Sequence, residues 1–132
     1  MKALVIDSTD YSLGIDFNPS SKSLKLWGES RPENAPAFFN PIIDWLKDYK
    51  SFLKDNPSSE KIKVDFEIEY FNSTSAKFIL DIFLALKNIA TEIPSIELDI
   101  NWLYLEIDED ILECGEEFQD LSGLDLNLIP KK

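Results

Sequence analysis

The stretch VDFEIEYFNSTSAKFILDIFLALKNI, residues 64–89, changes its hydrophobic period at its centre, and this change decides the fold. Apolar and charged residues alternate over residues 63–70, which predicts a strand with one apolar face. That face carries Val64, Phe66, Ile68 and Tyr70. From residue 75 to residue 93 the apolar side chains recur every three or four positions, which predicts an amphipathic helix ending before Pro94. Because alternation returns in residues 95–104, the order strand, helix, strand favours two parallel strands joined by a right-handed crossover.

The N-terminal part predicts a hairpin followed by a long helix. Residues 12–30 contain two apolar runs around an Asn-Pro-Ser-Ser break, which is typical of a β-hairpin with a loop of four or five residues. Residues 34–53 have helical spacing, with Asn34 as the predicted N-cap and Pro36 in the first turn. Pro41 lies close enough to the start to bend this helix without abolishing it.

The C-terminal part predicts a short helix over residues 108–121 and a final strand or tail over residues 124–129. The polar alternate positions of the two crossover strands must meet water, so helices should cover mainly one face of the sheet. With 132 residues, the chain is expected to form a single domain over residues 1–132. The predicted fold class is α/β, with a mixed β-sheet and helices packed mainly on one face.

The chain is strongly acidic. Thirteen Lys and Arg residues against 25 Asp and Glu give a formal net charge of −12. This charge repels phosphate backbones and anionic lipids, so we expect neither a nucleic acid nor a membrane as partner. No apolar run reaches the roughly 20 residues of a membrane-spanning helix. The single cysteine, Cys114, fits a reducing compartment, and the predicted location is the cytoplasm.

The sequence argues against an enzyme. It has no histidine, no glycine-rich phosphate loop and no pair of thiols, so we expect no catalytic residues and no cofactor. Residues 108–117 hold six acidic side chains, which raises the question of a cation site. They lack the alternating ligand spacing and central glycine of a calcium loop, and a solvated acidic helix face is favoured over a metal site.

Four hydrogen-bonding residues, Asn72, Ser73, Thr74 and Ser75, stand between the central strand and its helix. One of them is expected to be the N-cap. A cap needs only one residue, and a helix N-terminus accommodates a phosphate, so the excess also fits a phosphoacceptor site. Lys77, one turn further on, either pairs with such a phosphate or is an ordinary solvated lysine.

Three sequence anchors recur in a known family. They are Pro32-Glu33-Asn34, then Tyr70-Phe71-Asn72 with the hydroxyl residues and Lys77, then Trp102 with Tyr104 ahead of the acidic segment Gly115-Glu116-Glu117-Phe118. In this order and spacing they resemble the SiaC family of bacterial regulatory phosphoproteins, which are small STAS-like domains. The resemblance covers most of the chain and implies a single STAS-like domain.

The resemblance implies a partner switch. In that family a Ser/Thr protein kinase phosphorylates the hydroxyl cluster, a PP2C-type phosphatase reverses the reaction, and the unmodified form binds an effector, in the best-known case a diguanylate cyclase. The family's acceptor threonine falls on Ser73 here. Because Thr and Ser are exchanged, Thr74 is an alternative acceptor.

The rest of the switch surface is carried over in the same way. The expected members are Arg31, Glu33, Asn34, Asn72, Ser75 and Lys77. Arg31 stands where the family usually has an aromatic residue, and Leu105 and Ile107 interrupt its usual acidic run, so the effector's identity is left open. The alternative function is a constitutive protein-interaction module of the same fold, without phosphorylation.

Overall fold

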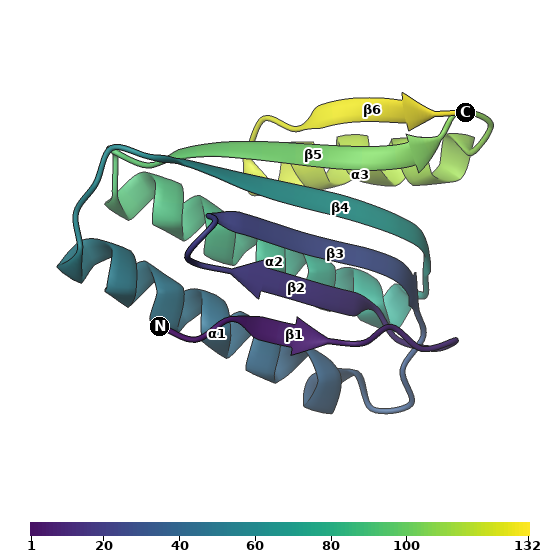
Figure 1. Cartoon of the computed structure of the whole chain (residues 1–132). Coiled ribbons are helices and arrows are strands. Elements are labelled where there is room, and N and C mark those ends of the chain that lie inside the picture. The colour runs from purple at the N-terminus through teal and green to yellow at the C-terminus, as the bar shows by residue number, and fades with distance from the viewer.

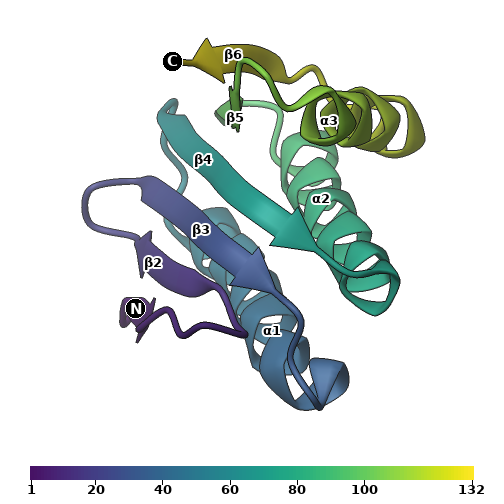
Figure 2. The same cartoon turned by 90° about the vertical axis from the view of Figure 1, so that its right-hand side faces the viewer.

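Three β-α-β units in succession build most of the molecule. The computed structural model describes residues 1–132 and contains one six-stranded sheet with three helices. The strands are β1 (Leu4–Ile6), β2 (Gly14–Asn18), β3 (Ser23–Ser30), β4 (Lys61–Phe71), β5 (Glu97–Leu105) and β6 (Asn127–Lys131). The helices are α1 (Ala35–Asp55), α2 (Ser73–Glu92) and α3 (Glu109–Ser122), and all three lie on the same face of the sheet (Figures 1 and 2).

The strand order follows the sequence from β1 to β6. β1, β2 and β3 pair antiparallel, whereas β3 to β6 are parallel to one another. The predicted parallel crossover of β4, α2 and β5 is therefore confirmed, and so are the mixed sheet, the hairpin loop between β2 and β3 and the helices on one face. The strand β1 and the parallel pairing of β3 with β4 and of β5 with β6 were not predicted.

Stacked aromatic rings fix α2 against the sheet and against α3. Phe66 of β4 lies 4.4 Å from Phe83 of α2, centroid to centroid, and Phe83 lies 5.2 Å from Phe118 of α3. Phe66 and Phe83 are fully buried, and Trp102 of β5 packs against both. Aromatic pairs at such distances add about 0.5–1.5 kcal/mol beyond the burial of their area. These core rings thus fix the middle of α2.

A β-bulge near the end of β4 overturns one prediction. Gly28 pairs with Ile68 but the next residue of β3, Glu29, pairs with Tyr70, which leaves Glu69 as an extra residue. An extra residue reverses which side chains face the core. The prediction that Tyr70 shares the apolar face is therefore wrong, since Tyr70 is 45% exposed.

The bulge turns Phe71 inward in place of Tyr70. Phe71 packs against Phe118 of α3, with the ring centroids 5.7 Å apart. On the partner strand, Gly28 adopts a φ of 99°, a conformation that side chains other than glycine rarely accept. The bulge therefore anchors the last residue of β4 to the core immediately before the hydroxyl cluster.

Candidate functional site at the junction of β4 and α2

The connection between β4 and α2 is a single residue, Asn72. Its side-chain Oδ1 accepts a hydrogen bond from the backbone N–H of Ser75 at 2.9 Å, and its carbonyl oxygen accepts one from Ala76 at 3.0 Å. The N-cap predicted within the cluster is therefore Asn72. Because Asn72 does the capping, the three hydroxyl side chains that follow are not needed for it.

Ser73 and Thr74 occupy the first two positions of α2, and both are exposed. Neither side-chain hydroxyl has a hydrogen-bond partner in the chain, and the backbone N–H groups of these two residues have no acceptor within the helix. The helix dipole adds partial positive charge at this end. Both hydroxyls are thus accessible to another protein, and both sit where a negative group would be stabilised.

Ser75 is placed differently. It is fully buried, and its Oγ accepts a hydrogen bond from the Ser30 hydroxyl at 2.8 Å and donates one to the Ser30 carbonyl oxygen at 3.2 Å. The expectation that Ser75 contributes to an exposed surface is therefore wrong. Its role is to attach the first turn of α2 to the end of β3. Sequence reasoning missed Ser30 altogether, because a serine at a strand end carries no signal of its remote partner.

The segment after Ser30 brings the other expected residues to the same end of the sheet. Asn34 caps α1 as predicted, since its Oδ1 accepts a hydrogen bond from the N–H of Ala37 at 3.2 Å. Arg31 lies next to Ser30, but its guanidinium contacts Glu29 at 3.3 Å and lies over the Tyr11 ring at 5.7 Å. Arg31 therefore faces the connection between β1 and β2 rather than the hydroxyl cluster.

Two further charged residues of the predicted surface are exposed. Glu33 is in the loop before α1 and makes no ion pair. Lys77 pairs with Asp81 one turn along α2, at 3.4 Å, and its Nζ lies 4.6 Å from the centre of the Phe78 ring. In the unmodified chain Lys77 is thus an ion-paired surface lysine. It stands three and four positions after the two free hydroxyls, a spacing that places side chains on one helix face.

The acidic helix α3 lies beside α2, on the side away from α1 (Figure 2). Burial raises the pKa of the Cys114 thiol, and the surrounding carboxylates, led by Glu117, raise it further. A raised pKa disfavours the thiolate and hence nucleophilic reactivity.

No group of three or more His, Cys, Asp or Glu side chains is arranged to hold a metal ion. None of the three helices is both long and apolar enough to cross a membrane.

Comparison with known proteins places this geometry in a family. The model of SiaC family regulatory phosphoproteins matches residues 6–131. The chain belongs to the SiaC family. An uncharacterized protein of Pseudomonas aeruginosa (strain UCBPP-PA14) is 28% identical over 120 residues, which are 91% of this chain and 90% of the relative.

Solved SiaC structures have the same fold. SiaC of P. aeruginosa is 21% identical and superposes with a TM-score of 0.82 over 99% of this chain and 100% of its own. A second structure contains the diguanylate cyclase SiaD of that organism in complex with its activator SiaC, and its match has a TM-score of 0.83 at 23% identity, over 97% and 99% of the two chains. The resemblance seen in the three sequence anchors is thereby confirmed, together with the mixed sheet and its helices.

Proposed function

We propose that this chain is a non-enzymatic, cytoplasmic partner switch in which phosphorylation of Ser73 or Thr74 controls binding to an effector protein. One observation carries the proposal: Asn72 already caps α2, yet two exposed hydroxyls without hydrogen-bond partners remain at the first two helical positions. Membership of a family of regulatory phosphoproteins supports it. A Ser/Thr protein kinase and a PP2C-type phosphatase are the proposed modifying enzymes.

Local charge is the proposed signal. A phosphate adds about −1.5 to −2 charge at neutral pH. The helix N-terminus stabilises this charge within the protein, while an effector docked over the junction meets repulsion and a desolvation cost. Because the cap and the Ser30–Ser75 pair lie beneath the exposed hydroxyls, the fold itself is expected to change little.

The proposed effector is a diguanylate cyclase. Support comes from the SiaC–SiaD complex, in which the matching protein is an activator of a diguanylate cyclase. The identity to that SiaC is 23%, so the effector class rests on the shared family and fold. The unmodified chain is the form proposed to bind.

Mass spectrometry tests the modification. The protein is purified from its native host with and without phosphatase treatment, and the intact mass is followed by peptide mapping. A phosphatase-sensitive gain of about 80 Da on the segment of residues 64–87 is expected, and fragment ions decide between Ser73 and Thr74. Absence of the gain under several growth conditions would favour the constitutive interaction module instead.

Acidic variants test the consequence for binding. Ser73→Asp and Thr74→Asp, singly and together, should weaken binding to a diguanylate cyclase of the same genome, while the circular dichroism spectrum stays unchanged. Ser51→Asp is the matched control, since Ser51 is an exposed helical serine away from the junction. Unaltered affinity of the double variant, measured by calorimetry, would contradict the proposed switch.

A further inference from the structure

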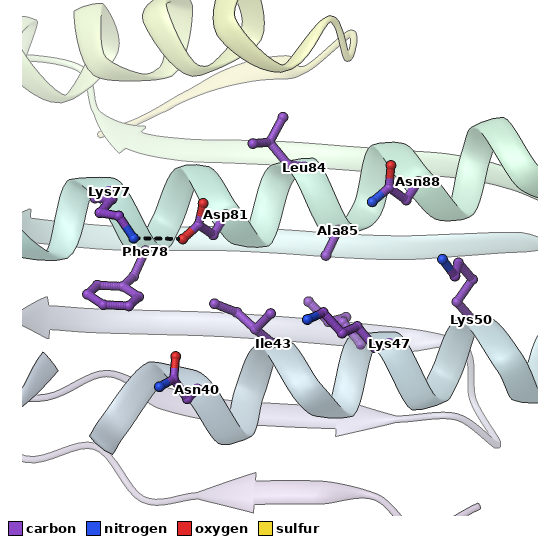
Figure 3. A pocket seen from close by; sticks show the side chains of 11 residues that line it. Asn40, Ile43, Lys47, Lys50, Lys77, Phe78, Asp81, Leu84, Ala85 and Asn88 are labelled. Carbon is purple, nitrogen blue, oxygen red and sulfur yellow. Dashed lines mark hydrogen bonds and ion pairs between the residues drawn. The ribbon is translucent and has the colours of Figure 1, made fainter. Parts of the chain in front are cut away.

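A groove of about 340 Å³ runs between α1 and α2 on the helical side of the molecule (Figure 3). The two helices lie side by side, and the stacked rings of Phe39 and Phe78, with centroids 5.3 Å apart, hold them together. Lys77, near the start of α2, lines the groove and follows Ser73 and Thr74 by one helical turn. The groove thus begins beside the hydroxyl cluster.

The lining combines an apolar floor with a basic rim. The apolar residues are Ile43, Leu46, Phe78, Leu84 and Ala85, of which all but Leu46 are partly exposed. The charged residues are Lys47, Lys50, Lys77 and Asp81, and the amides are Asn40 and Asn88. Three lysines against one carboxylate is an unusual balance in a chain with a net charge of −12.

The ion pairs of the rim show which lysines lack a carboxylate partner within the chain. Lys47 has no carboxylate partner, whereas Lys50 pairs with Glu92 at 2.7 Å and Lys77 pairs with Asp81 at 3.4 Å. Glu92 also pairs with Lys54 at 2.6 Å, so with these two carboxylates counted four positive charges face two negative ones, which leaves a net charge of +2. An acidic partner is therefore favoured here by charge complementarity, although most of the surface repels it.

We propose that this groove receives an acidic amphipathic helix of the effector. Apolar side chains spaced three and four residues apart on such a helix would contact Ile43, Phe78 and Leu84, and its carboxylates would face Lys47 and Lys50. The chain's own α3 is acidic, but its apolar residues Ile111 and Phe118 are buried in the core. Leu121 is the only large apolar side chain of α3 that is largely exposed, so a second copy of this chain offers a single apolar anchor along this acidic helix.

Lys77 couples the groove to the phosphorylation site. It is four positions after Ser73 and three after Thr74, within reach of a phosphate on either residue. A phosphate carries more charge than the Asp81 carboxylate and attracts Lys77 away from it. Asp81 is then left unpaired in the groove and repels the acidic helix. This step rests on the proposed function, whereas docking of the helix to the unmodified chain does not.

Nuclear magnetic resonance tests the docking. The probe is a synthetic helix of about 20 residues built from Leu, Glu and Ala, with leucines in an amphipathic pattern and a net charge of about −6. Amide shifts of the labelled protein should concentrate on residues 40–50 and 77–88, and a peptide with Lys in place of Glu should cause none. Shifts elsewhere, equal shifts with both peptides, or dimerisation of the protein through the groove would overturn the proposal.

Charge variants sharpen this test. Lys47→Glu should weaken binding of the acidic peptide by at least about threefold, because it reverses the one unpaired cation. Asp81→Asn should strengthen binding. Lys61→Glu is the matched control, an exposed lysine without an ion pair on β4, outside the groove, and should behave as the wild type apart from a small general effect. Equal losses in Lys47→Glu and Lys61→Glu would overturn the assignment to the groove.

A double-mutant cycle tests the coupling. Protein carrying phosphoserine at position 73 should bind the acidic peptide more weakly than the unmodified wild type. In Lys77→Gln the unmodified form should already bind weakly, and phosphorylation should weaken it less. An undiminished effect of phosphate in Lys77→Gln would overturn the coupling but not the docking. If phosphate has no effect in the wild type and the peptide still binds in the groove, the proposed switch fails and the docking site stands.

Discussion

The hydroxyl oxygens of Ser30 and Ser75 lie 2.8 Å apart in the interior, and neither residue is exposed to solvent. The Ser30 carbonyl oxygen also accepts hydrogen bonds from the Ser75 hydroxyl at 3.2 Å and from the backbone N–H of Asn72 at 3.0 Å. Three hydrogen bonds thus join the end of β3 to the start of α2. They hold the exposed Ser73 and Thr74 in a fixed place above the sheet.

Removing one hydroxyl of this pair should destabilise the fold. Ser75→Ala leaves the Ser30 hydroxyl buried without its acceptor, so a loss of about 1–3 kcal/mol in the free energy of unfolding is expected. Adding Ser30→Ala should cost less than the sum of the single changes, because the double variant leaves no unpaired side-chain hydroxyl. Urea denaturation measures all three variants.

The control for this pair is Ser73→Ala. Ser73 is exposed and makes no side-chain hydrogen bond, so its loss should change stability by under about 0.5 kcal/mol. Equal costs for Ser73→Ala and Ser75→Ala would show that the buried pair contributes nothing specific.

Local periodicity could predict the elements but not their registers. The change of period around residue 72 predicts both β4 and α2, because each apolar face must meet one core. The bulge at Glu69 depends on how β3 pairs with β4, and hydrophobic alternation within β4 carries no sign of it. Tyr70 was therefore assigned to the wrong face. β1 was missed because three residues with one exposed apolar side chain show no clear period.

For the candidate site, the sequence could predict the position but not the role of each residue. Its position followed from the hydroxyl-rich sequence between two elements of different period. The assignment of separate roles to Asn72, Ser73 and Ser75 was not predictable, because all three can accept the capping hydrogen bond. The fold separates them, since only Ser75 meets Ser30, a residue 45 positions earlier.

Gly115 should tolerate no side chain. A Cβ atom at this position would lie 2.5 Å from Cδ1 of Trp102, whose indole N–H donates a hydrogen bond to the Ile111 carbonyl oxygen at 2.9 Å. Trp102 is almost fully buried, so Gly115→Ala must displace α3 or the indole. We expect a loss of about 1–3 kcal/mol, measured by urea denaturation. Glu113→Ala, an exposed change in the same helix, is the control and should leave the unfolding midpoint nearly unchanged.

Tyr49 should make stability fall at high pH. Its hydroxyl is buried without a hydrogen-bond partner, and burial raises the pKa of the phenol above 10.0. Folding therefore favours the neutral form. The resulting stability is fully present below the unfolded pKa of about 10 and is lost as the pH rises through the folded pKa.

Tyr49→Phe tests this assignment. It removes the unpaired hydroxyl and should raise the free energy of unfolding at neutral pH by about 1 kcal/mol. It should also remove the part of the decline above about pH 10 that Tyr49 causes. Tyr11→Phe is the control, because Tyr11 is 62% exposed. An identical alkaline decline in the wild type and in Tyr49→Phe, followed by urea midpoints, would refute the role of Tyr49.

Glu92 should make stability fall at low pH. Its carboxylate oxygens lie 2.7 Å from Nζ of Lys50 and 2.6 Å from Nζ of Lys54. These two ion pairs join the last turns of α1 and α2. Hydrogen bonds from these lysines lower the pKa of Glu92 from 4.5 to about 2. Because the folded pKa is lowered, the stabilisation is present above about pH 4.5 and is lost as the pH falls toward about 2.

Glu92→Gln should remove this part of the acid slope and shift the urea midpoint less between neutral and acidic pH than the wild type does. The residue is exposed, so added salt should shrink the difference. Glu97→Gln, at an exposed glutamate without an ion pair, is the control. The Glu92→Gln variant also releases Lys50 in the groove from its ion pair. Stronger binding of the acidic peptide is therefore expected together with weaker acid dependence, and unchanged binding would mean that Lys50 does not contact the partner helix.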